Sequence, residues 1–299
     1  MANTVNSNLN NNIISSSALE QFTSILAPLS AFSTSFNDEA AQKGTTISIT
    51  KISNTSSADD FAAATGYLSM DTTYGAVQIT INRHKIVTWH VTDTEVSESS
   101  AVELQRFGYQ KGGDLAKAVF QDVLGQVTNS VFSSKITVAV GDFDADEVAD
   151  LREDGVDESL YPDQCSLILA NDYFTALLKD SDLSHALNYG SAEVIQGGRI
   201  PSLFGIKSIY ESNSVPANSE DLKGFYCHPS AMAIGMRYLQ PTNTKEYIAA
   251  RKLTDPATGI TMGYREFYDP KLGVQTAALE CVYGFTVGIS ENLIRVVAS

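Results

Sequence analysis

The densest group of chemically active side chains in this sequence is an acidic cluster at residues 142–158. It holds nine acids and one base, a net charge of −8. Five of the acids fall at positions 1, 3, 5, 9 and 12 of a calcium-binding loop, namely Asp142, Asp144, Asp146, Asp150 and Glu153. Position 6 holds Glu147, where the sharp turn of that loop requires glycine. Because Phe143, Val148 and Leu151 fit an amphipathic helix, we favour a solvated acidic helix and keep calcium binding as the alternative.

The histidines do not form a pattern suited to a metal site. His84 and His90 lie six residues apart on an expected strand, on one face but about 20 Å from each other, too far to share an ion. His185 and His228 are isolated. Cys227 precedes His228, but neighbours in sequence need not form a thiolate–imidazole pair. The sequence therefore predicts no metal ligands.

The cysteines and the known nucleotide and hydrolase motifs are equally uninformative about catalysis. Cys165, Cys227 and Cys281 are far apart and form no C-x-x-C, so we expect buried, reduced thiols in a protein made in a cytosol. The sequence contains no G-x-S-x-G, no G-x-x-x-x-G-K-[ST] and no G-x-G-x-x-G. We predict no catalytic residues and no cofactor. A carboxylate pair for glycoside hydrolysis stays open, because acids are abundant and nothing singles out a pair.

Composition limits the partners that the protein can have. Of 299 residues 43% are hydrophobic, which excludes wholesale disorder and collagen-like repetition. Twenty basic against thirty-five acidic residues give a net charge of −15, which disfavours sequence-specific binding to nucleic acid. No stretch approaches the roughly 18 apolar residues of a membrane span. The first basic residue is Lys43, so we expect no secretion signal and no membrane partner.

The elements that would position functional side chains begin with a nearly uncharged N-terminal segment, in which Glu20 is the only ionisable side chain up to residue 37. Residues 1–12 are rich in asparagine and are expected to be flexible. The apolar residues of 13–36 fit a helical stripe broken at Pro28. This arm could pack on its own core or on a neighbouring subunit. Under the second reading its contact residues are Phe22, Ile25, Leu26, Phe32 and Phe36.

The next segment is expected to be a long β-ribbon. Residues 45–52 and 77–81 alternate between apolar and polar side chains, and 87–91 continues the pattern. The small, polar residues 53–74 would form its tip. Because one face of each strand is apolar, the ribbon needs a surface to lie on, either its own domain or a partner. The candidate contact residues are Ile47, Ile49, Ile79, Ile81 and Trp89.

The rest of the chain alternates helices and strands. A long helix is expected at residues 99–132, with apolar residues every four positions and a bend at Gly108, Gly112 and Gly113. Strands are expected at 137–140 and 166–170, with further strand signals across 193–210. We expect helices at 144–153 (ended by Gly155), 172–178 and 230–238. The C-terminal part predicts strands at 247–253, 260–268, 274–287 and 293–297.

This order of elements resembles the major capsid protein of tailed bacteriophages, a fold shared with encapsulin shells and the herpesvirus capsid floor. Residues 105–131, with Asp122, are similar to the spine helix of that family, and residues 165–178 resemble the opening of its axial domain. The closing strands are matched by Asp269-Pro270 and Tyr283-Gly284-Phe285. A further family pattern is carried by Gly198, Ile200, Leu203, Gly205, Ile206, Ser212, Val215 and Pro216.

The resemblance implies an α+β protein with the tailed-phage major-capsid fold. Its parts would be an N-terminal arm at residues 1–42 and an extended β-hairpin loop at 43–92. A peripheral domain with the long spine helix would follow at 93–140. An axial α/β domain would occupy 141–240, and return strands of the peripheral domain 241–299. Some relatives form a Lys–Asn cross-link, for which Lys51 is the ribbon candidate.

The same resemblance implies a structural, non-enzymatic function. The chain would assemble into pentamers and hexamers of an icosahedral head shell around a double-stranded DNA genome, and would reside in the virion after synthesis in the bacterial host cytoplasm. Its partners would be other copies, a portal, decoration proteins and DNA bound without sequence specificity. Since no long charged segment precedes the arm, we expect a separate scaffolding protein rather than a fused one.

Three alternatives remain. An encapsulin-type nanocompartment would share the fold and differ in its content. A β-rich adhesin or binding module is suggested by the abundance of Ser, Thr and Asn, but the long apolar stripe of the helix disfavours it. A hydrolase would use an acid pair from Asp142, Asp144 and Asp146.

Overall fold

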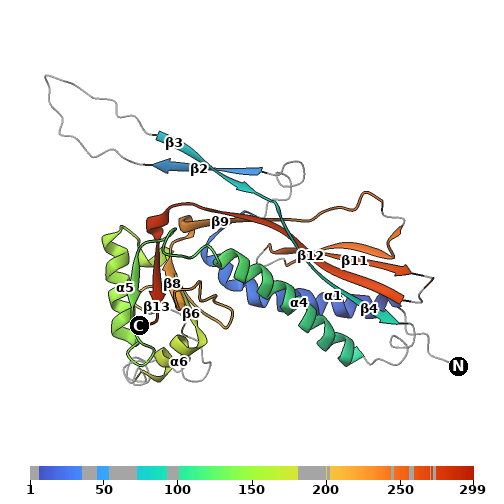
Figure 1. Ribbon diagram of the computed structural model, residues 1–299, viewed down its shortest axis with the longest axis horizontal. Helices are drawn as coiled ribbons and strands as arrows, with labels where there is room; N and C mark the ends of the chain where they lie inside the picture. Colours follow the sequence, from blue (N-terminus) through green and yellow to red (C-terminus); the bar gives the residue numbers. More distant parts are fainter. Residues whose placement is uncertain are drawn as a thin grey trace.

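The computed structural model describes residues 7–35, 46–53, 73–92, 101–180, 200, 203–243, 246–255, 259–269, 271 and 274–299. It is an α+β structure, as expected, with two bodies and a two-stranded ribbon that projects from them (Figure 1). No helix in this described part of the chain is long and apolar enough to cross a membrane.

The first body is a six-stranded sheet with two helices on one face (Figure 1). Strand β12 is its centre, because it pairs with β11 and then β9 along one edge and with β4 along the other. The strands are β1 (Ser33–Ser35), β4 (Arg83–Thr92), β9 (Met232–Arg237), β10 (Ala249–Thr254), β11 (Thr261–Asp269) and β12 (Val274–Val287). The helices are α1 (Ser7–Leu26), followed by the 3-10 turn η1 (Ala27–Ala31), and α4 (Ala101–Leu124).

The second body is a five-stranded sheet in the order β5-β13-β8-β6-β7. One face carries α5 (Ala145–Asp157) and α6 (Asn171–Lys179), and residues of the other face, such as Ile168 and Phe225, join the core of the first body. The strands are β5 (Lys135–Thr137), β6 (Ser166–Ala170), β7 (Ser208–Ser212), β8 (Leu222–Cys227) and β13 (Leu293–Val297). Short 3-10 turns connect them: η2 (Pro162–Gln164), η4 (Pro229–Ala231) and η6 (Ser290–Asn292).

The path of the chain between the two bodies differs from the sequence-based division. Strand β9, inside the segment expected to be axial, belongs to the first sheet, and the C-terminal β13 belongs to the second. A fully buried arginine fixes β13 within the second sheet. Arg295 of β13 contacts Glu220, the Asn129 side chain and the backbone oxygen of Phe132. The two bodies therefore share strands and a core.

The ribbon consists of β2 (Thr46–Ser53) and β3 (Thr73–Thr80), which pair antiparallel. Its register places Ile47 opposite Ile79 and Ile49 opposite Val77, as the alternation in the sequence predicts. The expected tip at 53–74 lies outside the described residues except at its two ends, and so does half of the strand pattern expected at 193–210. Figure 1 shows the ribbon extending away from both bodies.

Three helix predictions need correction. The long helix expected at 99–132 ends at Leu124. Residues 230–238 form η4 and strand β9, because this segment lies between β1 and β12 and is buried on both faces, where no alternation reveals a strand. Helix α5 does not end at Gly155 but continues to Asp157. A β-carbon on Gly155 would lie 2.6 Å from the ring of Tyr226, so this glycine allows close packing. Strands β6, β10, β11, β12 and β13 are confirmed within two residues.

The glycines of α4 do not bend the helix. They allow α1 to pack closely against it. Helix α4 is continuous, and Gly108 and Gly112 lie one turn apart on its face toward α1. A β-carbon at Gly108 would lie 2.5 Å from the backbone oxygen of Ile14, and one at Gly112 would lie 2.2 Å from that of Ala18. The two helices therefore run parallel in backbone contact. Because α1 begins at Ser7, the expectation of flexibility is wrong for residues 7–12.

Replacing Gly112 with alanine should lower the stability of the unassembled subunit by about 1–3 kcal/mol, because the new methyl group overpacks the helix contact. Gly113→Ala is the matched control: its β-carbon would meet Gln21 at an ordinary 3.5 Å, so the gain in helix propensity should stabilise by up to about 1 kcal/mol. Urea unfolding followed by the fluorescence of Trp89, the single tryptophan, measures both. Equal effects of the two substitutions would contradict the contact.

Candidate assembly surfaces

The N-terminal arm is not free to bind a neighbour in this structure. Phe22, Leu26 and Phe32 are buried in the core of the first body, and Ile25 packs against that core. Phe36 lies outside the described residues. The prediction that these side chains contact another subunit is therefore wrong for Phe22, Leu26 and Phe32: the glycine face of α4 offers the neutral arm a surface within its own chain.

The base of the ribbon is also anchored within one copy. Ile79 and Ile81 form a small buried cluster with Ala233 and Val282 on the face of the first sheet opposite the helices. Gly284 of β12 allows the end of β3 to pass close to β12, because a β-carbon on this glycine would lie 2.1 Å from the backbone oxygen of Thr80. Ile79 and Ile81 thus attach the ribbon to its own sheet, which corrects their assignment as contacts between subunits.

Trp89 requires the same correction. It lies on the helix face of β4, buried in the main core, with its ring 5.7 Å from that of Phe107 and 6.3 Å from that of Tyr264. Of the predicted contact residues, this leaves Ile47, Ile49 and Lys51 on the projecting strand β2, whose backbone the structure places. Their role in assembly stays a prediction.

A charged network ties the ribbon to the long helix. Arg83, the first residue of β4, donates to both carboxylate oxygens of Asp122 on α4, at 2.6 and 2.8 Å, and its guanidinium lies 4.4 Å from the ring centre of Phe285. The hydroxyl of Tyr283 also donates to Asp122. Burial alone would raise the pKa of Asp122, but the hydrogen bonds from Tyr283 and Arg83 outweigh it and hold that pKa below its usual value. The carboxylate therefore stays charged and fixes β4 and β12 to α4.

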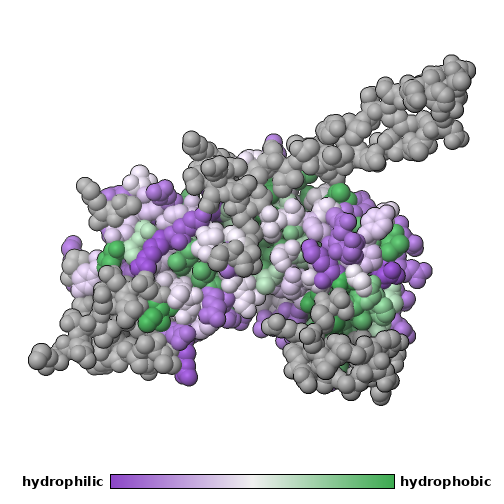
Figure 2. All heavy atoms as spheres, turned by 180° about the vertical axis from the view of Figure 1, so that it is seen from behind, coloured by the Kyte–Doolittle hydropathy of each residue, from purple (hydrophilic) through white to green (hydrophobic). Residues whose placement is uncertain are grey.

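The sheet face opposite the helices remains partly open. Ile86 of β4 is 58% exposed, and Phe267 at the far end of β11 is exposed as well. Between them lies the buried carboxylate of Glu280, bound by Arg265 Nε at 2.7 Å and His84 Nε2 at 3.1 Å. Seen from behind the view of Figure 1, the surface mixes hydrophilic and hydrophobic residues (Figure 2).

The described histidines and the cysteines lie in structural positions, and His185 lies outside the described residues. His90 contacts Thr276, whereas His84 contacts Glu280, so the two side chains have different partners. Both ring nitrogens of His228 are engaged, with Ser230 and Gln164. All three cysteines are buried and unpaired, as predicted. Burial raises the pKa of Cys227 well above its usual value and that of Cys281 to about 12, so these thiols are protonated at neutral pH.

The acidic cluster forms the amphipathic helix that the sequence favours. Asp144 caps α5: its carboxylate accepts the backbone N–H of Asp146 at 2.8 Å, and Glu147 accepts the backbone N–H of Asp144 at 3.1 Å. Val148 and Leu151 are buried beneath the helix. Within the described ranges, no group of three or more His, Cys, Asp or Glu side chains is arranged to hold a metal ion.

The network around Asp122 and the contacts of Gly108, Gly112 and Gly284 were not predicted from the sequence. Asp122 was noted for its resemblance to a family position, but its partners Arg83 and Tyr283 are 39 and 161 residues away. The spacing of Gly108 and Gly112 by four residues was the one local signal, because it places both on the same helix face.

Comparison with solved structures assigns the fold. The chain is similar to a chain of the capsid of cyanophage P-SCSP1u, with a TM-score of 0.61 and 13% identity over 90% of this chain and 86% of the other. A chain of the mature capsid of bacteriophage PhiM1 matches with a TM-score of 0.59 and 12% identity, over 90% of this chain and 86% of the other. The virus-like particle from Pyrococcus furiosus matches with a TM-score of 0.51 and 11% identity, over 95% of this chain and 97% of the other. This chain has the phage capsid fold.

The comparison of three-dimensional structures detects the capsid fold where the comparisons of sequences do not. No protein-family model matches the sequence, and no curated protein matches it. The solved structures match about nine-tenths of this chain, so the likeness extends over both sheets. The resemblance inferred from the order of elements is thereby confirmed at the level of the fold.

Substituting Asp122 with asparagine should reduce the stability of the subunit at pH 7 by about 1–2 kcal/mol, because charge-assisted hydrogen bonds from Arg83 and Tyr283 are weakened. A carboxyl whose pKa is lowered by folding stabilises above its unfolded pKa, and this contribution disappears as the pH falls through the folded pKa. The difference in stability between wild type and variant should therefore shrink as the pH falls below 3.8, the ordinary pKa of an aspartate.

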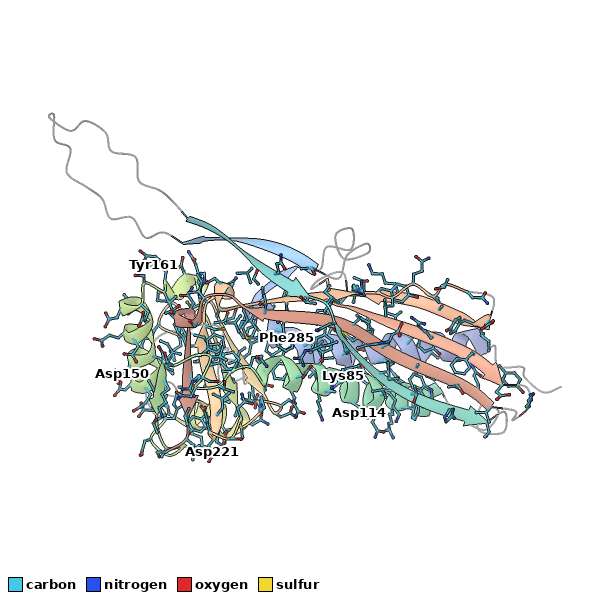
Figure 3. The ribbon with its side chains drawn as sticks, turned by 45° about the horizontal axis from the view of Figure 1, so that its top comes forward. Lys85, Asp114, Asp150, Tyr161, Asp221 and Phe285 are labelled. Carbon is cyan, nitrogen blue, oxygen red and sulfur yellow. The ribbon has the colours of Figure 1, made fainter. Side chains whose placement is uncertain are left out.

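Urea unfolding of unassembled subunits at pH 7 and near pH 3 measures this difference. Asp114→Asn is the control, because Asp114 lies exposed on the same helix (Figure 3). A difference between wild type and Asp122→Asn that is independent of pH, or a control with the same loss, would show that the ion pair does not carry the effect.

Proposed function

We propose that this chain is the subunit of an icosahedral protein shell, the major capsid protein of a tailed bacteriophage. The observation that carries the proposal is the similarity to phage capsid chains over about nine-tenths of the sequence. In this role the chain is structural and has no catalytic residues. The proposed site of action is the virion, after synthesis in the bacterial cytoplasm.

The projecting ribbon supports assembly through neighbours. A two-stranded ribbon is marginal by itself in water, and β2 and β3 pair in a ribbon that projects from its base on the first sheet (Figure 1). Contact with an adjacent copy would bury the apolar residues of the ribbon, which stabilises the assembly by about 25 cal/mol for each Å² of apolar surface removed from water. Because such a contact is head-to-tail, rotation closes it into rings. Pentamers and hexamers of this kind would form the shell.

The proposed partners follow from the shell. They are other copies of the chain, a separate scaffolding protein, a portal, decoration proteins and packaged DNA. The net charge of −15 would keep the DNA from adhering to the wall. A nanocompartment that holds a protein cargo is the second candidate, because the virus-like particle from Pyrococcus furiosus matches 95% of this chain. We also propose that Lys51 is the cross-linking residue if such links form.

Expression of the full chain in bacteria, alone and together with a candidate scaffolding protein, tests the shell. We expect closed shells, rings or tubes by negative-stain microscopy, since the ribbon favours closure with neighbours. A subunit that stays monomeric under both conditions would contradict the proposal. In particles from the natural source, nuclease-resistant double-stranded DNA identifies a virion, whereas a packaged enzyme identifies a compartment.

A substitution on β2 tests the ribbon directly. Ile49→Asp should reduce the yield of particles at least about tenfold, because a charge would be buried at the subunit contact, while subunit stability changes by less than about 0.5 kcal/mol. Thr50→Asp is the control with the same charge at the next strand position, since neighbouring positions alternate between faces. Sucrose-gradient sedimentation measures assembly. Normal particles with Ile49→Asp would contradict a ribbon contact.

A further inference from the structure

Two of the segments that connect the two bodies run side by side. One is η4, which leads from β8 of the second sheet to β9 of the first, and the other is 288–292, which leads from β12 of the first sheet to β13 of the second. The backbone oxygen of Ser230 accepts the N–H of Ile289 at 3.0 Å. That of Asn292 accepts the N–H of His228 at 3.0 Å. We call these two hydrogen-bonded segments the junction.

The ring of His228 holds the junction together. His228 occupies the position before η4, and its Nδ1 accepts the backbone N–H of Ser230 at 3.2 Å. The hydroxyl oxygen of Ser230 lies 2.7 Å from the same nitrogen and accepts a hydrogen bond from the side chain of Asn292. A single ring nitrogen is therefore linked to both segments.

The acceptor role of Nδ1 requires a neutral ring. A neutral imidazole has one acceptor nitrogen and one N–H group, whereas an imidazolium has two N–H groups and no acceptor. Because Nδ1 accepts the N–H of Ser230, the single ring proton lies on Nε2, which donates to Oε1 of Gln164 in η2 at 3.1 Å. A second proton would turn Nδ1 of His228 into a donor that faces the N–H of Ser230. The charged ring is therefore incompatible with the hydrogen bonds of the junction.

The surroundings of His228 also favour the neutral ring. Burial lowers the pKa of His228 below its usual value of 6.5 and is the one cause of this shift. The acids next to its partners are Asp163 on η2 and Glu291 on η6, and both are exposed. Arg295 on β13 is bound to the acceptors described above. The adjacent thiol of Cys227 is protonated, because burial raises its pKa.

We propose that His228 is a pH switch in the junction: its neutral imidazole keeps the two segments closed, and its imidazolium lets them open. A histidine whose pKa is lowered by folding stabilises the fold above its unfolded pKa, and this contribution is lost as the pH falls through the folded pKa. The junction is therefore closed at pH 7.5 and loosened at mildly acidic pH. The switch belongs to the single subunit and operates whether or not the chain forms a shell.

Hydrogen–deuterium exchange of the full-length, unassembled chain tests the switch. Peptides that contain 228–231 and 288–292 are compared at pH 7.5 and at about pH 5, after correction for the intrinsic effect of pH on exchange. We expect their protection to fall roughly three- to tenfold at the lower pH, because the acceptor for the N–H of Ser230 is lost. Equal protection at the two pH values would overturn the proposal.

His228→Asn separates titration from a merely structural role. Asparagine at this position accepts the N–H of Ser230 at either pH, because its amide does not titrate in this range. The junction of this variant should therefore keep its protection at about pH 5. His90→Asn is the matched control, since His90 contacts Thr276 on the first sheet, and it should respond as the wild type does. A full response to pH in His228→Asn, or its loss in His90→Asn, would contradict the switch.

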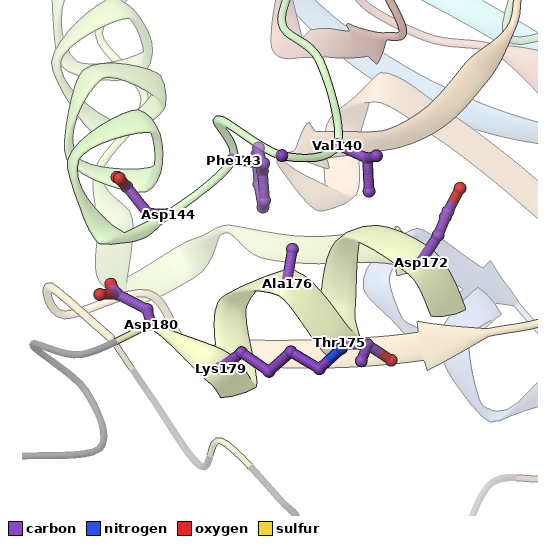
Figure 4. Close-up of a pocket in the computed structure, with 9 residues that line it drawn as sticks. Val140, Phe143, Asp144, Asp172, Thr175, Ala176, Lys179 and Asp180 are labelled. Carbon is purple, nitrogen blue, oxygen red and sulfur yellow. The ribbon is translucent and has the colours of Figure 1, made fainter.

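Glu147 is the second group whose titration must be separated. Burial, and then a hydrogen bond with Asp144, raises the pKa of Glu147. Asp144 lies at the N-terminal end of α5, where that helix faces α6 (Figure 4). Glu147→Gln removes this titration, while its amide oxygen still accepts the backbone N–H of Asp144. The junction of Glu147→Gln should respond to pH as in the wild type, and a response that disappears in this variant would overturn the proposal.

Discussion

Backbone contact between α1 and α4 is the constraint from which the rest of the first body follows. Two glycines on one face of α4 bring the helix backbones together at Ile14 and Ala18, at positions where any side chain would meet a carbonyl oxygen. This contact buries the neutral arm beneath the sheet and gives Phe22 and Leu26 a place in the core. The arm is therefore part of the folded subunit before any assembly takes place.

The same long helix also determines where the ribbon leaves the body. Asp122, one turn from the end of α4, holds Arg83 and Tyr283, which lie on adjacent strands at the base of the ribbon. Gly284 lets the end of β3 cross β12 in close contact. A rigid base with a projecting ribbon is the arrangement that a shell subunit needs, because a head-to-tail contact closes only when its direction is fixed.

Local patterns were sufficient to predict much of the fold. The apolar positions of α4 and the alternation in β2, β3 and β4 carry their period in the sequence, and Pro28 correctly marked the end of α1. Strand β9 was missed because it is buried on both faces and so has no period of 2. The glycines of α4 were misread because helix propensity describes an isolated helix, whereas their role depends on a partner.

The candidate surfaces were harder to predict for a related reason. A neutral, apolar segment such as residues 13–36 must be covered, but its sequence does not say by which surface. Apolar alternation in the ribbon likewise did not separate Ile79 and Ile81, which are buried at its base, from Ile47 and Ile49 on the partner strand β2. The ion pair between Arg83 and Asp122 joins elements that only the folded chain brings together.

A cryo-electron microscopy map of assembled particles tests the central claim most directly, namely that each subunit retains its arm and extends only its ribbon to a neighbour. The account predicts that α1 remains against α4 of the same chain, with Ile14 and Ala18 on Gly108 and Gly112, while β2 and β3 lie on the adjacent subunit. A map in which α1 lies on another copy, or in which the ribbon folds back onto its own sheet, would contradict it.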